Sequence, residues 1–233
     1  MHSTKLHAKI TSVKKEILQN DIEIQPLQIR DCGLSEYKKI LDLQLELLHE
    51  RTNETISDSI IIVEHPDVIT FGARQSANKL LVSREELAKR NIDIVEIRRG
   101  GGTTAHNPGQ LVFYPIISLK QMSLGISEYI RTLETIGREL LSQYDLACDV
   151  KKGYPGLWVG QKKIASIGVR VSKLITYHGM AINIQNDLGI FDYIEPCGLD
   201  NVKMTSLTNE TGKKYSMELI KQKLTEILIR HFS

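Results

Sequence analysis

Residues 93–118 read DIVEIRRGGGTTAHNPGQLVFYPIIS, and this stretch indicates the fold class most clearly. Both of its ends, 93–98 and 111–118, are rich in branched and aromatic residues, which predicts strands. Between them, Gly100-Gly101-Gly102 has no Cβ atoms, so the backbone can approach a ligand closely and direct amide groups toward it. The alternative is an ordinary turn between strands, where glycine and proline are common.

Outward from this stretch, strand-like and helix-like segments alternate, which predicts an α/β or α+β layer architecture. Apolar runs predict further strands at 22–30, 59–64, 68–71, 156–159, 164–171 and 177–184. Apolar residues at helical spacing predict helices after Ser35 and Ser83, which we expect to act as N-caps, from about Ser127 to Tyr144, and from about Ser216. We expect one domain over residues 27–233, preceded by a variable extension over residues 1–26.

The composition excludes several classes of protein. The chain has 233 residues, a formal net charge of +2 and 41% hydrophobic residues, which are ordinary globular values. No apolar run is long enough to span a membrane, and the near-neutral charge argues against a dedicated nucleic-acid binder. The three cysteines form no CxxC pair, so we expect no structural metal and a reducing compartment. Since the N-terminus lacks a secretory signal, we expect a cytoplasmic protein, with organellar import left open.

Two clusters lie at the ends of expected strands. Lys162 and Lys163 precede the strand at 164–171, and side-chain alternation places them on opposite faces, so at most one can point into a pocket. His178 lies in an otherwise apolar strand and is followed by small residues that would leave room for a ligand chain. A solvated pair of lysines and a hydrogen-bonded core histidine are the alternative interpretations.

Among the cysteines, Cys197 has the most unusual setting. It lies between Pro196 and Gly198, an arrangement that would expose a thiol at a turn. An exposed free thiol is readily oxidised, so it is seldom present without a use. By contrast, we interpret Cys148 as a buried small hydrophobe and Cys32 as structural.

Taken in order, these clusters resemble the lipoyl(octanoyl) transferase family of lipoate biosynthesis. The matching motifs are an arginine-glycine loop ending in Pro-Gly-Gln at 99–110, Lys-Ile-x-Ser-x-Gly at 163–168, Thr-x-His-Gly at 176–179 and Pro-Cys-Gly at 196–198. Glu-His-Pro at 64–66, Thr-Phe-Gly at 70–72 and Leu-Ser-Glu-Tyr at 34–37 also match, so the resemblance covers about residues 27–230. Ala105 and Asn107 depart from the family pattern, which usually has tyrosine and glycine there.

The resemblance implies the fold of biotin and lipoate protein ligases, a mixed β-sheet flanked by helices. It implies transfer of octanoyl from octanoyl-acyl carrier protein to a lysine of lipoyl domains, including those of 2-oxoacid dehydrogenase complexes and the glycine cleavage H protein, with no cofactor. By motif, Cys197 is the nucleophile and Lys163 its acid/base partner. The implied substrate-binding residues are Arg99, Gly100, Gly101, Gly102, Thr103, Thr104, Ala105, His106, Ser166, Ile167, Gly168, Gly179, Met180 and Ala181.

The implied chemistry is physically sound. A free cysteine has a pKa of about 8.5, and a nearby ammonium typically lowers that pKa by about 1–3 units. Exchange between two thioesters is nearly balanced in free energy, so no ATP is needed, which agrees with the absence of a P-loop. A neutral Lys163 could then remove a proton from the attacking substrate lysine, while His106 and His178 shape the acyl tunnel.

Three other functions remain open at this stage. An ATP-dependent lipoate or biotin protein ligase shares the expected fold but needs no cysteine, so Cys197 is the discriminating residue. A metalloprotein could use His106, His178 and Cys197 as zinc ligands. A non-catalytic acyl-binding module would keep the glycines and tolerate the loss of Cys197.

Overall fold

A mixed seven-stranded sheet forms the centre of the protein. The structure, a computed structural model, describes residues 26–196 and 202–233. Strand order is β1-β2-β6-β10-β9-β8-β7, with β1 parallel to β2 and every other neighbouring pair antiparallel. The strands are β1 (Gln28–Leu34), β2 (Ser59–Glu64), β6 (Gln110–Ile116), β7 (Asp149–Lys151), β8 (Tyr154–Val159), β9 (Lys162–Ser172) and β10 (Ile175–Asn183).

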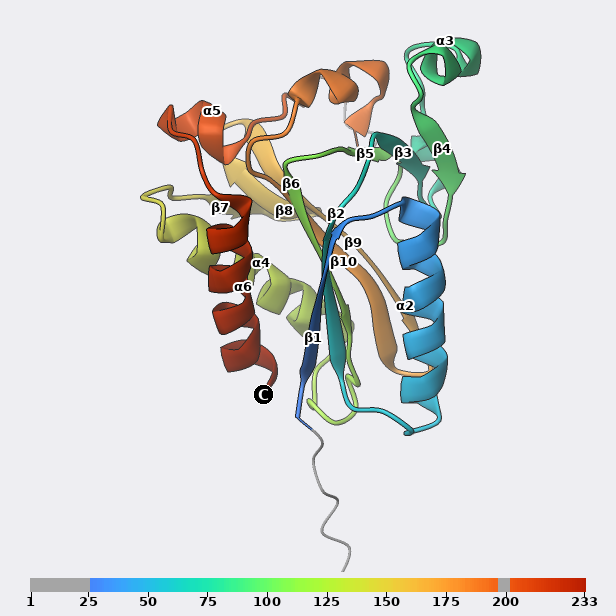
Figure 1. Ribbon diagram of the computed structural model, residues 1–233, viewed down its shortest axis with the longest axis vertical. Coiled ribbons are helices and arrows are strands. Elements are labelled where there is room, and N and C mark those ends of the chain that lie inside the picture. Colours follow the sequence, from blue (N-terminus) through green and yellow to red (C-terminus); the bar gives the residue numbers. More distant parts are fainter. Residues whose placement is uncertain (1–25, 197–201) are drawn as a thin grey trace, which may run out of the picture.

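Helices cover both faces of this sheet (Figure 1). One face packs against α4 (Ile126–Ser142) and α6 (Met217–Phe232), and the other against α2 (Tyr37–Thr52). In the interior strand β2, every residue from Ile60 to Val63 is apolar: Ile60 and Ile62 enter the α4–α6 core, whereas Ile61 and Val63 enter the core beneath α2. A strand buried on both faces needs apolar residues at every position.

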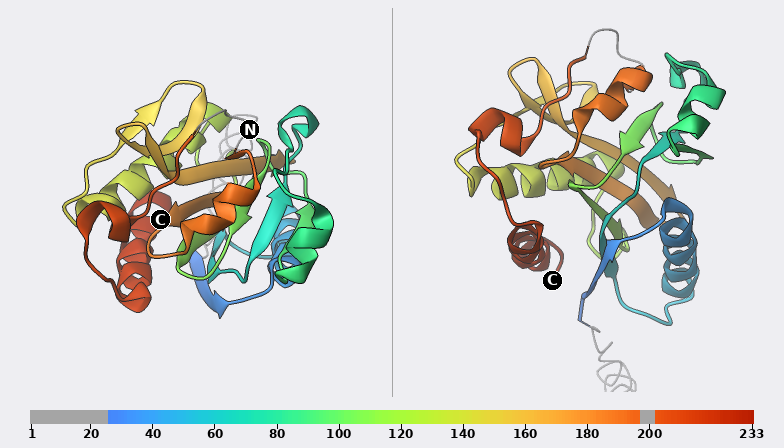
Figure 2. Two further views of the ribbon diagram at one scale, coloured as in Figure 1. Left: turned by 90° about the horizontal axis from the view of Figure 1, so that it is seen from above. Right: turned by 45° about the horizontal axis from the view of Figure 1, so that its top comes forward.

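A smaller sheet lies beyond one end of α2, near the top of Figure 1. It contains β4 (Asp93–Glu96), β3 (Val68–Phe71) and β5 (Thr104–His106) in that order, with the short helix α3 (Arg84–Lys89) beside it. A 3₁₀ segment, Leu188–Tyr193, packs against this sheet through a shared apolar cluster. It is the orange coil in Figure 2. The glycine-rich loop joins β4 to β5, so the small sheet positions that loop.

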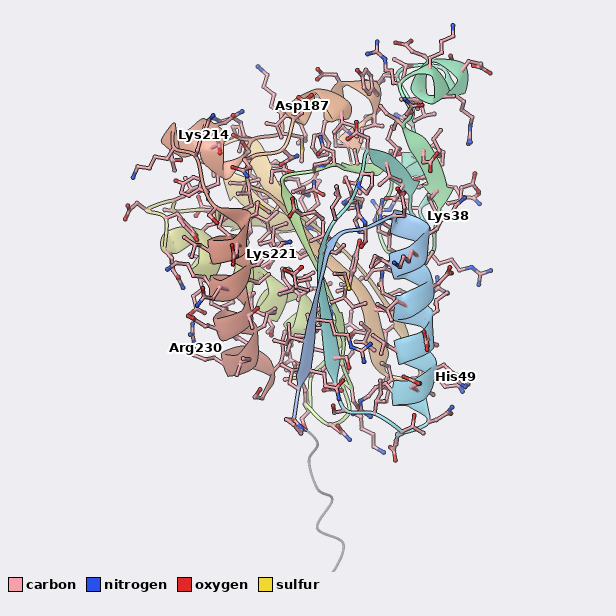
Figure 3. All side chains as sticks on the ribbon, viewed as in Figure 1. Lys38, His49, Asp187, Lys214, Lys221 and Arg230 are labelled. Carbon is pink, nitrogen blue, oxygen red and sulfur yellow. The ribbon has the colours of Figure 1, made fainter. Side chains whose placement is uncertain are left out.

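Lys221, which is labelled on α6 in Figure 3, links the C-terminal helix to the sheet. Its Nζ lies 3.3 Å from the Asp31 carboxylate on β1 and 3.1 Å from that of Glu64 at the end of β2. Glu64 also accepts a hydrogen bond from the N–H of Gly109, over 2.9 Å. The contact therefore holds α6, two strands and the Pro108-Gly109 turn together.

The predicted elements are largely confirmed. Strands β2 and β3 have the expected bounds, and Ser83 caps α3 by accepting the N–H of Glu86. The prediction for Ser35 was wrong: Glu36 is the N-cap of α2, and the Ser35 hydroxyl donates to the carbonyl of Cys32. Strands β5 and β7, the 3₁₀ segments and α5 (Leu207–Thr211) were not expected, because they are too short for a periodic pattern.

The first predicted strand, 22–30, is observed at Gln28–Leu34, and residues 22–25 lie outside the described part. None of the helices that the structure describes is long and apolar enough to cross a membrane.

Candidate active site

A narrow cavity of about 40 Å³ lies between α2 and the large sheet. Its walls come from the glycine-rich loop, from β9 and β10, and from the first turn of α2. Most of the predicted substrate-binding residues line it, namely Arg99, Gly100, Gly101, Thr104, His106, Ser166, Ile167, Gly168, Gly179, Met180 and Ala181. Four more residues complete the lining: Tyr37, Val112, Tyr114 and His178. Segments far apart in the sequence therefore meet around one cavity.

The structure places three predicted substrate-binding residues outside the cavity lining. A Cβ on Gly102 would lie 2.3 Å from the carbonyl oxygen of Ala77. The Thr103 hydroxyl accepts the N–H of Lys79 over 2.9 Å, and Ala105 is fully buried in the core of the small sheet. These three residues therefore hold the glycine-rich loop in place and do not line the cavity.

Arg99 anchors the glycine-rich loop with its own side chain. Nη2 donates to the carbonyl of Thr70 at 2.9 Å and to its hydroxyl at 2.8 Å, and Nη1 donates to the carbonyl of Gly100. Glycine is required opposite this side chain, because a Cβ on Gly168 would lie 2.8 Å from Arg99 Cδ. A Cβ on Gly72 would likewise lie 2.2 Å from the carbonyl oxygen of Gly101. The glycine-rich loop thus packs closely against Gly168 and Gly72, where a larger residue would not fit.

One wall of the cavity is polar, although it is buried. Nδ1 of His65 lies 2.7 Å from the carbonyl oxygen of Ser35, so it carries the proton, and Nε2 accepts from the Tyr114 hydroxyl over 2.9 Å. The ring of Tyr37 stacks on His106, with 5.6 Å between ring centroids. Nδ1 of His106 donates in turn to Gln110 over 2.7 Å. A hydrogen-bonded aromatic cluster therefore forms this wall of the cavity.

The histidines of this cluster are neutral at pH 7. Burial lowers the pKa of His65 to about 4 and the pKa of His178 to about 3. Burial also places the pKa of His106 well below its usual range, and the nearby Arg99 guanidinium adds to this effect. For the same reason burial raises the pKa of Tyr37 to about 12. The charge at this wall of the cavity is carried by Arg99.

His178 is held in an unusual backbone conformation. Its φ is +55°, a value that few residues other than glycine adopt, and its N–H donates to Oε1 of Gln44 on α2 over 2.8 Å. The side chain is 1% exposed and lines the cavity. Its Nδ1 has no hydrogen-bond partner among the residues that the structure describes. His178 is therefore not a core histidine that is fully hydrogen-bonded.

The two lysines lie on opposite sides of β9, as alternation predicted. Lys163 is 2% exposed, its Nζ donates to the carbonyl of Pro155 over 3.0 Å, and it lies 5.1 Å from the ring centroid of Trp158. Lys162 is exposed and pairs with the Glu210 carboxylate. Burying an ammonium group costs free energy, so the buried position of Lys163 requires stabilising contacts with its surroundings.

A β-bulge turns Lys163 toward the cavity side of the sheet. Leu157 pairs with Ala165, whereas the next residue, Trp158, pairs with Lys163, so Ile164 is an extra residue in β9. An extra residue shifts the alternation of side chains by one position. Lys163 thus shares a face with Ser166 and Gly168, which line the cavity.

The predicted nucleophile, Cys197, lies outside the described residues. The chain on its C-terminal side pairs with the predicted base: the N–H of Lys163 donates to the carbonyl of Lys203, and the N–H of Thr205 donates to the carbonyl of Lys163, both over 2.9 Å. On the N-terminal side, Glu195 forms an ion pair with Lys79 over 2.9 Å.

The other two cysteines are free thiols with raised pKa values. Burial raises the pKa of Cys148 to about 11 and also raises the pKa of Cys32. Neither is a thiolate at neutral pH. Within the described part of the chain, no group of three or more His, Cys, Asp or Glu residues is placed to hold a metal ion.

Comparisons with known proteins agree with this geometry. Residues 36–229 match the family described as the lipoyl protein ligase A/B catalytic domain. The octanoyltransferase of Desulfovibrio desulfuricans is 37% identical over 182 residues, covering 78% of this chain and 76% of that protein. The mitochondrial octanoyltransferase LIP2 of Arabidopsis thaliana is 38% identical over 209 residues, covering 89% of each chain.

The chain belongs to the octanoyltransferase family. Solved structures confirm the expected fold for this octanoyltransferase. A lipoate-protein ligase A bound with ATP matches with a TM-score of 0.65 at 15% identity, covering 89% of this chain and 85% of that chain. P. falciparum LipL1 in complex with lipoate matches with a TM-score of 0.70 at 13% identity, covering 88% of this chain and 62% of that chain. At such low identity these likenesses show the fold alone.

Proposed function

We propose that this octanoyltransferase takes its acyl group from octanoyl-acyl carrier protein and passes it to a lysine of a lipoyl domain through a thioester on Cys197. The curated relatives are named octanoyltransferases, which supports the reaction. The observation that carries the mechanism is the buried Lys163 ammonium, on the cavity face of β9 and hydrogen-bonded through its backbone to the segment that follows Cys197.

In the first half-reaction, the Cys197 thiolate attacks the thioester carbonyl of the donor. The Lys163 ammonium stabilises the thiolate, because an opposite charge nearby favours the charged form. The bond between the carbonyl carbon and the pantetheine sulfur then breaks. The departing thiolate takes a proton from Lys163, which leaves an octanoyl-cysteine and a neutral lysine.

In the second half-reaction, the amine of the acceptor lysine attacks the octanoyl-cysteine. Neutral Lys163 takes the proton that the attacking nitrogen loses, and the bond between the carbonyl carbon and Cys197 Sγ breaks. The products are an amide and the original pair of Cys197 thiolate and Lys163 ammonium. The cycle closes with atoms and charges balanced, so one lysine serves both halves.

The octanoyl chain would occupy the cavity beside Ser166 and Gly168. The lining of this cavity includes the apolar side chains of Val112, Ile167, Met180 and Ala181, which suits an acyl chain. Acceptors of this kind are the lipoyl domains of 2-oxoacid dehydrogenase complexes and the glycine cleavage H protein. Binding energy for the chain comes from apolar burial, about 0.8 kcal/mol for each buried CH₂ group.

The direct test is transfer without ATP. Purified protein is mixed with octanoyl-acyl carrier protein and a lipoyl domain, and the intact mass of the lipoyl domain is recorded. The expected result is a gain of one octanoyl group. If the lipoyl domain is modified only when free octanoate and ATP are supplied, the protein is a ligase and the proposed mechanism is wrong.

A further inference from the structure

The end of the cavity at His178 does not match the chemistry of an octanoyl tail. Lys163 lies near the start of β9, and His178 pairs with Val169 toward the other end of that strand. In the proposed function, on which this inference rests, the acyl carbonyl lies at the Lys163 end. The distal end of the chain therefore points toward His178, Tyr37 and Tyr114, whereas octanoyl ends in a methyl group.

At that end of the cavity, His178 has a ring nitrogen that makes no hydrogen bond within the described residues. Its Nδ1 is buried and has no partner among the described residues. The amide Nε2 of Gln44, whose Oε1 accepts the N–H of His178, is also buried without a partner in the same part of the structure. Buried polar groups in folded proteins are nearly always hydrogen-bonded, so an unpaired nitrogen on a side chain that lines a cavity, as His178 does, points to a ligand group.

Most other polar atoms near His178 already have hydrogen-bond partners. The Tyr114 hydroxyl donates to His65, Nδ1 of His106 donates to Gln110, and the Arg99 guanidinium donates to Thr70 and Gly100. The neutral imidazole of His178 carries one donor and one acceptor nitrogen, and a hydroxyl group can pair with either. A hydroxyl is also small enough to be placed at the end of an alkyl chain.

We propose that the end of the cavity at His178 is a hydrogen-bonding subsite. This subsite accepts acyl chains that carry a hydroxyl group at their distal end. The substrate class is an ω-hydroxyacyl thioester of medium length. The His178 side chain recognises the hydroxyl, and the remainder of the chain lies along Gly168 and Ala181.

The experiment compares two donors of equal size. The 8-hydroxyoctanoyl and nonanoyl thioesters of acyl carrier protein have the same number of heavy atoms and differ only in the terminal group. We expect their kcat/KM values to agree within about threefold in the unaltered protein. An apolar end would reduce kcat/KM for the hydroxylated donor by about 30-fold or more, because a hydroxyl buried without a partner is strongly disfavoured.

His178→Asn removes the imidazole and keeps a residue that tolerates positive φ. The ratio of hydroxylated to unsubstituted kcat/KM should fall about tenfold in this variant, since one hydrogen bond is lost. His178→Gly also fits the backbone, and it should show the same fall if the asparagine variant does not fold. Tyr144→Phe removes a hydroxyl on the α4–α6 side of the sheet, outside the cavity lining, and should leave the ratio unchanged.

The outcomes separate this inference from the proposed function. If the unaltered protein transfers octanoyl but discriminates about 30-fold or more against the hydroxylated donor, the subsite is refuted and the proposed function stands. An unchanged ratio in both His178 variants also refutes it. If no acyl group is transferred from acyl carrier protein at all, the proposed function is wrong, and the subsite with it.

Discussion

The backbone N–H of Lys163 donates a hydrogen bond to the carbonyl of Lys203 over 2.9 Å. This bond joins the buried lysine of β9 to the segment that follows Pro196-Cys197-Gly198 in the sequence. Thr205 adds a second bond by donating to the carbonyl of Lys163. The relationship supports a single catalytic unit that contains both the predicted base and the predicted nucleophile.

The first prediction contrasts the two adjacent lysines. Lys163→Met keeps most of the side-chain volume and removes the ammonium, so it should slow both half-reactions by about 10²–10⁴-fold. Lys162→Met removes an exposed partner of Glu210 and should change the rates little. Single-turnover rates of octanoyl transfer measure both effects. Equal rates in the two variants would show that Lys163 has no special role.

The second prediction concerns the width of the acyl cavity. Gly179→Leu, which the glycine motif first suggests, is unsuitable, because a Cβ there would lie 2.2 Å from the Phe113 carbonyl oxygen and would disrupt the sheet. Ala181 lines the cavity, so Ala181→Val should fill part of its space.

Since a longer chain needs more of that space, Ala181→Val should lower kcat/KM for octanoyl about tenfold more than for butyryl, with each excluded CH₂ group forfeiting about 0.8 kcal/mol. Ala88→Val, on the surface helix α3, is the matched control. A proportional loss for both donors in Ala181→Val would place the acyl chain elsewhere.

The third prediction concerns the stability of the aromatic cluster. Tyr114→Phe leaves Nε2 of His65 buried without a donor, so it should lower the free energy of unfolding by about 1–3 kcal/mol. Tyr144→Phe makes the same chemical change where the hydroxyl has no partner among the described residues, and its effect should be smaller. Urea denaturation of both variants makes the comparison. A smaller loss for Tyr114→Phe than for Tyr144→Phe would contradict the hydrogen bond.

The fourth prediction follows from the neutral histidines. The folded-state pKa values of His65 and His178 are lowered to about 4 and about 3, whereas an unfolded histidine has a pKa of about 6.5. Below pH 6.5 the unfolded chain therefore binds more protons, and the free energy of unfolding falls as pH decreases. Each histidine contributes up to about 1.4 kcal/mol per pH unit.

This loss should begin near pH 6.5 and continue toward pH 4, with little change between pH 7 and 8. Urea denaturation at pH 7.5, 6.0 and 5.0 measures it, and His178→Asn should have a shallower pH dependence. A constant free energy of unfolding from pH 7.5 to 5.0 would mean that these histidines are protonated in the folded state.

Local patterns in the sequence were sufficient to predict much of this fold. The run at 59–64 predicted a buried strand because it is apolar throughout, and β2 has those bounds. The alternation argument separated Lys162 from Lys163 correctly. It could not reveal the bulge at Ile164, which depends on the register with β8 and decides which neighbours share the face of Lys163.

The hydrogen-bonded aromatic cluster of the cavity could not be predicted from local patterns in the sequence. Tyr37 is one member of an apolar helical stripe, and Tyr114 is one residue of an apolar strand. Their importance arises from contacts with His65 and His106, which lie far away in the sequence. The Ser35 capping prediction failed for a related reason, because its hydroxyl donates back to the carbonyl of Cys32.

The most direct measurement is the intact mass of the protein after mixing with octanoyl-acyl carrier protein alone, without ATP or acceptor. The account predicts a gain of one octanoyl group, mapped to Cys197 by peptide analysis, in the unaltered protein and in the Cys32→Ser and Cys148→Ser variants. Cys197→Ala should show no gain. Full acylation of Cys197→Ala, or transfer to a lipoyl domain that proceeds in that variant at the normal rate, would contradict the account.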